Sequence, residues 1–263
     1  MLALEDVRVV FNKGTITEAV ALRGVSLQVN KGDFVTVIGS NGAGKTTMIE
    51  TISGTVPLDS GRISFMGRDV SRQPDYERAC CIGRVFQNPL AGTSPLMSIE
   101  ENLALAALRG QRRSLRLAVR AKRRREFRDA LGELGIGLEN RLTDPVALLS
   151  GGQRQCLTLL MATIRKPDLL LLDEHTAALD PKNQELVMSI TDRTIADHGL
   201  AALMVTHNMS HALDHGNRTV MMHAGTIVAS FGPEEKNTLT PQCLVEKFHE
   251  VRGAELDDRV LLC

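Results

Sequence analysis

Short apolar runs alternate with amphipathic segments along most of the chain. Phe34–Ile38 is rich in β-branched residues, and Leu169–Leu172 and Ala202–Val205 are equally short and apolar. Such runs are typical of strands that are buried on both faces. The first run leads through several glycines into the helical pattern Lys45–Ile52, and Gly54 marks the expected end of that helix. This succession predicts an α/β fold with a mostly parallel sheet.

The segments before and between these runs have a different period. Leu4–Phe11 and Val25–Val29 alternate apolar and polar residues, and Arg62–Met66 does the same. Alternation with a period of two is typical of strands that bury one face only. We therefore expect these three segments to form an antiparallel β subdomain near the N-terminus.

The middle and the end of the chain carry no strand pattern of this kind. Ile99–Leu134 has apolar residues at helical spacing, which predicts a helical subdomain inserted into the α/β core at about residues 90–148. The tail 233–263 is polar and charged, and we expect it to add one or two short helices. Residues 1–232 are thereby predicted to be one domain with an insertion.

Composition narrows the class of protein. The 263-residue chain has 31 Lys+Arg and 31 Asp+Glu, so its formal net charge is zero, and 43% of its residues are apolar. This is the balance of an ordinary globular protein. No nucleic-acid partner is expected, because binding through counterion release needs a net basic surface.

The apolar runs, the first residues and the cysteines indicate the cellular compartment of the chain. No apolar run approaches the ~20 residues that cross a bilayer, and Met1–Asp6 lacks the basic and apolar parts of a signal peptide. The five cysteines, among them the adjacent Cys80 and Cys81, form no CxxC pair. We therefore expect buried, reduced thiols in a cytosolic chain.

One segment predicts a specific chemistry. Gly39–Thr47 matches the pattern GxxxxGK[ST] and stands between a predicted strand and a predicted helix, as in a P-loop NTPase core. Its glycines let backbone N–H groups curl around a phosphate, and the helix N-terminus adds its positive dipole end. Lys45 is expected to reach the β- and γ-phosphates, and Thr46 to hold Mg²⁺. The predicted nucleotide-binding residues of this loop are Gly39, Ser40, Asn41, Gly42, Ala43, Gly44, Lys45, Thr46 and Thr47.

The ends of other predicted strands complete a nucleoside-triphosphate site. Asp173 and Glu174 follow the four leucines, and the carboxyl ends of parallel strands open on one crevice. We expect Asp173 to bind Mg²⁺ through water and Glu174 to polarise the attacking water. His207 ends another apolar run and is placed to sense the γ-phosphate. Gln87 is placed to bind Mg²⁺ and to signal the nucleotide state to the helical insertion.

Leu149–Gln153 predicts a second anion-binding helix start. Ser150 is the expected N-cap, and Gly151 and Gly152 expose the first N–H groups of the helix. The sequence contains one phosphate loop, so this second start needs a phosphate from elsewhere. Two copies arranged head to tail would place each Ser150 against the γ-phosphate held by the other copy. This predicts a twofold dimer with two ATP molecules between the protomers.

Over residues 2–232 the chain resembles the ATP-binding-cassette (ABC) ATPases. The motifs that carry the resemblance stand in the family's order and are Gly39–Thr47, Gln87, Leu149–Gln153, Leu169–Glu174, Ala178–Asp180 and His207. They resemble the Walker A loop, the Q-loop, the signature, the Walker B strand, the D-loop and the switch histidine. The resemblance implies an active ATPase that binds ATP and Mg²⁺, with Gln153 and Asp180 also at the nucleotide.

One aromatic residue and two departures from the family's usual residues lie near these motifs. Phe11 lies near where the family stacks an aromatic ring on adenine, and the alternative is a core residue of an edge strand. His175 stands where the family often has Pro or Ala, and Ala177 where it often has Ser. Neither departure removes a catalytic group.

The resemblance also implies what the ATPase drives. The loop that ends at Gln87 and the stretch Asp173–Asp180 resemble the ATPases of bacterial solute importers more than those of exporters. The chain would form a homodimer, or a heterodimer with a related ATPase, on the inner face of the membrane. There it would bind a separate transmembrane permease, with a substrate-binding protein acting indirectly. An amino-acid-like or other small organic solute is the preferred cargo. The alternative is a non-transport ABC ATPase that drives a soluble assembly scaffold.

Two segments have alternative interpretations. Gly92–Leu103 would form the permease surface, with Leu96, Met97 and Ile99 exposed, or these residues would belong to the core of the insertion. The basic stretch Arg109–Arg128 is a solvated helical face or a face that rests on acidic lipid headgroups.

Overall fold

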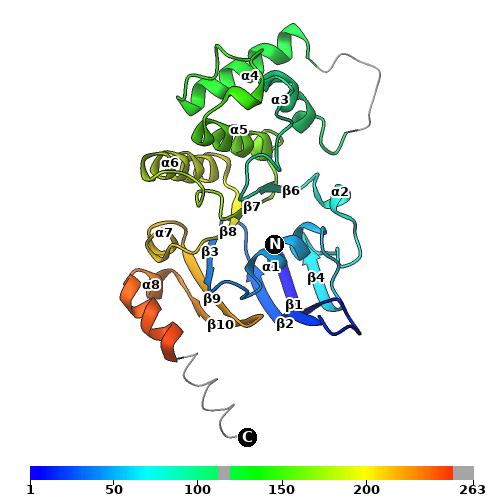
Figure 1. Cartoon of the computed structure of the whole chain (residues 1–263), viewed down its shortest axis with the longest axis vertical. Coiled ribbons are helices and arrows are strands. Elements are labelled where there is room, and N and C mark those ends of the chain that lie inside the picture. The colour runs from blue at the N-terminus through cyan, green and yellow to red at the C-terminus, as the bar shows by residue number, and fades with distance from the viewer. Residues whose placement is uncertain (112–118, 251–263) are drawn as a thin grey trace, which may run out of the picture.

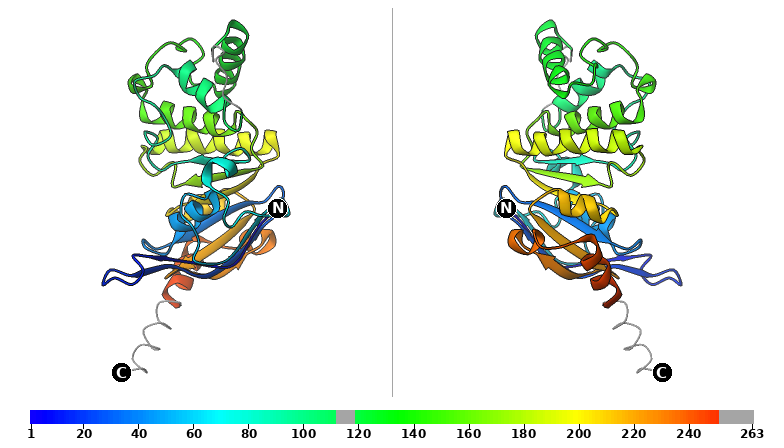
Figure 2. Two further views of the ribbon diagram at one scale, coloured as in Figure 1. Left: turned by 90° about the vertical axis from the view of Figure 1, so that its right-hand side faces the viewer. Right: turned by 90° about the vertical axis from the view of Figure 1, so that its left-hand side faces the viewer.

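A computed structural model describes residues 1–111 and 119–250, which form two sheets and a separate helical lobe (Figure 1). The central sheet has six strands in the order β10-β9-β3-β8-β7-β6, and a second sheet has the order β2-β1-β4-β5. The two sheets lie below the lobe, with β6 and β7 nearest to it, and the N-terminus leads into β1 of the second sheet (Figures 1 and 2). The prediction of an α/β fold with an antiparallel β subdomain and inserted helices is confirmed.

The central sheet is parallel except at one edge. β3 pairs in parallel with β8 and β9, β7 pairs in parallel with β8 and β6, and β10 is antiparallel to β9. The strands are β3 (Phe34–Gly39), β6 (Ile82–Val85), β7 (Leu169–Asp173), β8 (Ala201–Val205), β9 (Arg218–His223) and β10 (Thr226–Phe231). The ends of β3, β6, β7 and β8 therefore point the same way, as the site prediction requires.

The second sheet contains the alternating segments. β1 pairs antiparallel with β2 and with β4, and the short β5 follows β4. The strands are β1 (Leu2–Phe11), β2 (Ala19–Val29), β4 (Ser60–Phe65) and β5 (Arg68–Asp69). One face of this sheet packs on the main core and the other faces solvent, which is why apolar and polar residues alternate.

The four consecutive leucines of β7 divide between two cores. Leu169 and Leu171 pack with α1 (Lys45–Ser53) and the antiparallel sheet. Leu170 and Leu172 pack on the other face with α5 (Gly151–Thr163) and α6 (Pro181–His198). All four side chains are fully buried. An uninterrupted apolar run is therefore required, because both faces of this strand are covered.

The helical lobe has a core of its own. α3 (Ile99–Ala107), α4 (Ala121–Leu134) and one face of α5 enclose it, and a 3-10 turn (Val146–Leu148) leads into α5. Ser98 and Glu101 form a capping box that starts α3. The lobe therefore extends beyond the predicted insertion, since α5 belongs to it and also packs on the central sheet.

The structure divides the apolar residues of the predicted permease surface. Ile99 is fully buried in the core of the lobe, where it starts α3 against α5, so the core alternative holds for this residue. Leu96 is 91% exposed, and Met97 is half-buried.

The basic stretch lies partly outside the described residues, since 112–118 are not described. In the described part, Arg124 donates to both carboxylate oxygens of Glu100 at 2.5 Å and ties α4 to α3. Lys122, Arg125 and Arg128 are exposed on α4.

Residues 233–250 pack against the α/β core. α7 (Met209–Asp214) is followed by β9 and β10, then by α8 (Pro233–Lys236) and by helical residues 241–250. The buried Lys236 ammonium donates to the carbonyl oxygens of His215 and Gly216. Leu244 is fully buried beside Ile38, Met221 and Phe231. Within the described ranges, no helix is both long enough and apolar enough to cross a membrane.

A glycine and a buried arginine stabilise the end of α1. Gly54 ends α1 in the left-handed conformation, at φ 87°, as predicted. The buried Arg78 of α2 (Asp75–Arg78) donates to the carbonyls of Thr51 and Ile52.

Cys156 is buried, but the expectation of buried thiols is wrong for Cys80, which is exposed at the turn into β6.

Candidate nucleotide site

The phosphate loop joins β3 to α1 and needs its glycines for two different reasons. Gly42 and Gly44 have φ angles of 80° and 92°, which side chains with a Cβ rarely adopt. Gly39 has an ordinary φ, but a Cβ there would lie 2.5 Å from the carbonyl oxygen of Met222 on β9. The loop is thus a backbone cradle at the N-terminus of a helix, which fits a phosphate group.

The Lys45 side chain turns back into this loop. Its ammonium donates to the carbonyl oxygens of Gly39 at 2.8 Å and Ser40 at 3.1 Å. Burial lowers the pKa of Lys45, and the nearby charges of Glu174 and Asp173 oppose that shift. A buried cation inside a ring of backbone groups is suited to hold phosphate oxygens.

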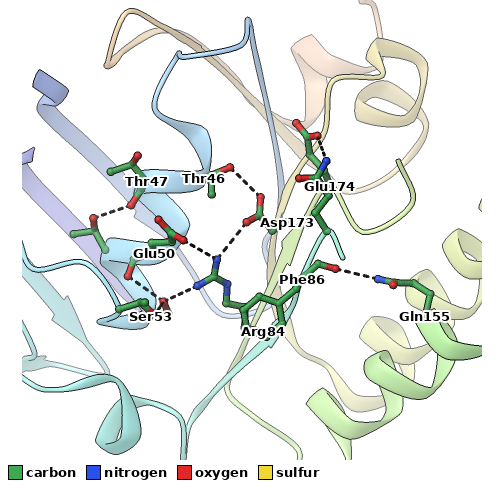
Figure 3. Close-up of polar contacts among 12 residues, drawn as sticks. Thr46, Thr47, Glu50, Ser53, Arg84, Phe86, Gln155, Asp173 and Glu174 are labelled. Atoms are coloured by element: carbon green, nitrogen blue, oxygen red, sulfur yellow. Dashed lines mark hydrogen bonds and ion pairs between the residues drawn. The ribbon is translucent and has the colours of Figure 1, made fainter. Parts of the chain in front are cut away.

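Thr46 and Asp173 are the pair that fits Mg²⁺. The Thr46 hydroxyl donates to Oδ1 of Asp173 at 3.3 Å (Figure 3). Burial raises the pKa of Asp173 above its ordinary value, and the contacts with Arg84 and the Thr46 hydroxyl partly oppose that shift. A hydroxyl and a carboxylate side by side are the hard oxygen donors that Mg²⁺ accepts beside substrate phosphates.

Glu174 lies at the centre of the predicted catalytic group. Gln87 donates from Nε2 to Oε2 of Glu174 at 3.3 Å, and Nδ1 of His207 lies 3.5 Å from the same oxygen. Glu174 itself has a φ of 43°, which turns the chain sharply at the end of β7. A cavity of about 60 Å³ is lined in part by Glu174, His207 and Thr206. The structure therefore brings the three predicted catalytic residues together, and two of them, Glu174 and His207, line a space that can hold water.

The signature segment starts α5 as predicted, but one of its glycines has another role. The Ser150 hydroxyl accepts from the N–H of Gln153 at 3.3 Å, and the Gln153 side chain returns to the N–H of Ser150. Gly151 is exposed, whereas Gly152 is buried, and a Cβ on Gly152 would lie 2.5 Å from Oδ1 of Asn183. Gly152 is buried because α6 begins against it at Asn183.

Asp180 and Asn183 connect this glycine to the D-loop segment. Asp180 is the N-cap of α6 and accepts from the N–H of Asn183 at 3.2 Å and from its Nδ2 at 2.5 Å. Asn183 therefore contacts both Asp180 and the start of α5. In Figure 1, α5 belongs to the lobe above the sheets, whereas α1 and the phosphate loop lie below it. Within one chain, the signature and the phosphate loop thus belong to different parts of the molecule.

Phe11 and His175 were also singled out from the sequence. Phe11 is 39% exposed at the end of β1, where it pairs with Ala19 of β2. His175 is buried, its Nε2 lies 3.2 Å from the Thr191 hydroxyl, and burial lowers its pKa to about 3. The side chain is therefore neutral and serves packing between β7 and α6.

Two residues at the site were missed from the sequence. Arg84 contacts Asp173 and Glu50, and its charge inside the apolar run Ile82–Val85 was an available signal. Asn183 had no such signal, because its contact with Gly152 depends on how α5 and α6 pack.

Comparison with known proteins gives close sequence relatives. A family model described as ABC transporter matches residues 22–177. The chain is 41% identical over 224 residues to a tyrosine transport ATP-binding protein of Clostridioides difficile (strain R20291), which covers 85% of this chain and 89% of that protein. It is 32% identical over 233 residues to the spermidine/putrescine import ATP-binding protein PotA of Protochlamydia amoebophila (strain UWE25). That match covers 88% of this chain but only 59% of the relative's length.

A solved structure has the same architecture. It is a dimeric ATP-binding cassette in a post-hydrolysis state, bound to ADP and Pi. The TM-score is 0.76 with 25% sequence identity, and the match covers 89% of this chain and 99% of that chain.

Proposed function

We propose that this chain, which belongs to the ABC transporter family of ATPases, couples ATP-driven head-to-tail dimerisation to solute import through a separate permease. As a member of this family the chain is an ATP hydrolase of importer type. The single observation that carries the proposal is the meeting of Gln87, Glu174 and His207 at one oxygen atom, Oε2 of Glu174. Three loops of different origin converge there, as a nucleotide-sensing switch requires.

The chemistry follows from the positions of the side chains. The loop N–H groups and Lys45 bind the phosphates, and Lys45 exchanges its loop carbonyls for phosphate oxygens. Thr46 and Asp173 would hold Mg²⁺, which when bound neutralises charge on the phosphate oxygens. Glu174 orients and polarises the attacking water, while Gln87 and His207 hold its carboxylate. Gln87 is also proposed to bind the metal when nucleotide is present.

The second half of each site comes from a second copy. Ser150 caps α5, which lies in the lobe, whereas α1 lies among the sheets below it (Figure 1). Its exposed neighbour Gly151 leaves the first turn of α5 open to a ligand. In a twofold dimer, Ser150, Gly151 and Gln153 of one protomer would contact the γ-phosphate on the other, with Asp180 at the same interface. Phe11 would stack on the adenine.

Exposed apolar residues support a permease surface at the entry to the lobe. Leu96 is 91% exposed, Leu105 on α3 is 54% exposed and Leu90 is 45% exposed. Large apolar side chains that face solvent within one segment are typical of a docking site. This site would attach the subunit to the inner face of the membrane, with a substrate-binding protein delivering the solute to the permease. The tyrosine transport relative supports an amino acid or a similar small organic solute.

The test of this function is the identity of the partners. The Glu174→Gln protein is purified from detergent-solubilised native membranes, and the proteins that co-purify are identified by mass spectrometry. A stoichiometric protein with several membrane spans is the expected result. Glu185→Gln, at an exposed position of α6, provides the matched control. Exclusively soluble companions, with the protein absent from the membrane fraction, would favour the assembly-scaffold alternative.

A further inference from the structure

Arg84 lies between the carboxylates of Asp173 and Glu50 beside the nucleotide site. It belongs to β6, and its side chain is 12% exposed. Nη2 lies 3.3 Å from Oδ2 of Asp173 and 3.4 Å from Oε1 of Glu50 on α1, and Nη1 lies 3.5 Å from the Ser53 hydroxyl (Figure 3). One guanidinium thus joins the end of β7 to the helix that follows the phosphate loop.

The two oxygens of Asp173 have different partners. Oδ1 accepts from the Thr46 hydroxyl at 3.3 Å, and Oδ2 accepts from Arg84 at 3.3 Å. Because the carboxyl group is planar, fixing Oδ2 also fixes the direction of Oδ1. The Arg84 contact therefore determines that Oδ1 faces Thr46.

Arg84 is itself held from the side of the helical lobe. Its guanidinium lies over the ring of Phe86, 4.6 Å from the ring centroid. The carbonyl oxygen of Phe86 accepts from Nε2 of Gln155 on α5 at 3.3 Å (Figure 3). The guanidinium has little freedom to follow a displaced carboxylate, since Glu50 and Ser53 hold it on one side and Phe86 supports it on the other.

We propose that Arg84 is a positioning residue for the metal carboxylate: it holds Oδ2 of Asp173 so that Oδ1 and the Thr46 hydroxyl stay together as two of the protein's Mg²⁺ donors. The inference rests on the proposed function, in which Thr46 and Asp173 hold the metal. Mg²⁺ demands near-ideal octahedral geometry, so a freely rotating carboxylate is a poorer donor. Outer contacts of this kind typically contribute 10- to 100-fold to metal affinity.

The experiment measures the metal dependence of nucleotide binding rather than turnover. A fluorescent, non-hydrolysable ATP analogue is bound first in excess EDTA and then in a Mg²⁺ titration. For Arg84→Met, we expect affinity in EDTA within about twofold of native, because Lys45 and the loop remain. The Mg²⁺ concentration at the midpoint should rise by about tenfold. Arg84→Lys keeps the charge but not the planar fork, so its midpoint should lie between the two.

Arg218 provides the matched control. It is partly buried on β9 and pairs with Asp33 at 2.8 Å, at side-chain exposures of 21% and 15%. Arg218→Met removes a comparable ion pair and should leave the Mg²⁺ midpoint unchanged. An equal shift in Arg218→Met, or an unchanged midpoint in Arg84→Met, would overturn the positioning role.

Three further outcomes separate a failure of the Arg84 role from a failure of the metal site. If Arg84→Met does not fold, the midpoint of Arg84→Lys decides, and a native midpoint there would overturn the inference. If the native chain binds the analogue equally with and without Mg²⁺, the metal site of the proposed function is wrong and the inference falls with it. If the native chain depends on Mg²⁺ and the Arg84 variants match it, the inference alone is wrong.

Discussion

The Thr46 hydroxyl lies 3.3 Å from Oδ1 of Asp173, although 127 residues separate the two in the chain. The contact arises because Thr46 is in the first turn of α1, which the phosphate loop joins to β3, and Asp173 ends β7. β8 lies between these strands, and all three are parallel. Parallel strands present their carboxyl ends at one edge, so two distant segments deliver a hydroxyl and a carboxylate to one place.

Lys45→Ala should weaken nucleotide binding itself. The Lys45 ammonium, which the loop carbonyls of Gly39 and Ser40 hold at 2.8 and 3.1 Å, is the buried cation of the phosphate loop. Loss of a charged hydrogen bond of about 1.5–3 kcal/mol corresponds to a 10- to 100-fold loss of affinity. Equilibrium titration of the native chain with a fluorescent ATP analogue checks this. Lys31→Ala, at an exposed position, is the control, and unchanged affinity of Lys45→Ala would exclude the phosphate contact.

Glu174→Gln should bind ATP normally, accumulate as a dimer and lose hydrolysis. A positioned general base contributes about 100- to 10,000-fold to a rate, so turnover should fall by at least about 100-fold. Chromatography with ATP and Mg²⁺ measures the dimer, and phosphate release measures turnover. Glu185→Gln should match the native chain in both. A Glu174→Gln protein with near-native turnover would remove Glu174 from its role.

Ser150→Arg should retain nucleotide binding and lose ATP-dependent dimerisation. The substitution puts a long cationic side chain at the helix start that is proposed to meet the γ-phosphate of the other copy. Ser98→Arg is the matched control, since Ser98 also caps a helix of the lobe with a capping box. Both variants should lose about 1 kcal/mol of stability through the lost cap. Dimerisation that is equally intact in both would contradict the head-to-tail arrangement.

Gly152→Ala should destabilise the chain, and Gly151→Ala should not. A Cβ on Gly152 would lie 2.5 Å from Oδ1 of Asn183, whereas one on Gly151 would lie 3.3 Å from Cδ2 of Leu179. Overpacking typically costs about 1–3 kcal/mol. We expect the free energy of unfolding, from urea denaturation, to be lower in Gly152→Ala than in Gly151→Ala by about that amount. Equal values would mean that Asn183 moves aside freely.

Lys236 should make stability depend on pH in the alkaline range. Burial lowers the pKa of Lys236 to about 8, although the charges of Asp214 and Asp192 oppose the shift. Between about pH 8 and the ordinary value of 10.5, the unfolded chain holds a proton that the folded chain has released. The free energy of unfolding contributed by this group therefore rises with pH in that window.

Lys236→Met removes this contribution and provides the measurement. Native stability relative to Lys236→Met should increase between pH 7.5 and 9.5 by more than about 1 kcal/mol, measured by urea denaturation. Lys122→Met, at an exposed position of α4, should show no such increase. A difference between native and Lys236→Met that stays constant with pH would show that the amino group keeps its proton when folded.

The amino-acid sequence was enough to predict the main elements and most residues of the candidate site. Gly39–Thr47 predicted the phosphate loop because its conformation depends on local φ angles and on the helix that begins there. Leu169–Leu172 predicted a strand covered on both faces, and Asp173 and Glu174 followed at its end. These features depend on short-range chemistry and on the rule that parallel strands end at one edge.

Contacts between side chains of different elements could be seen only in the folded chain. Leu96 and Ile99 lie close together in the sequence, yet Leu96 is exposed and Ile99 is buried, because Ile99 packs in the core that α3 shares with α5. Gly152 is buried because α6 begins against it at Asn183. Arg84 reaches Asp173 because β6 and β7 are neighbours in the sheet. Such contacts depend on how helices and strands pack, and local sequence patterns carry no record of the partner across a packed interface.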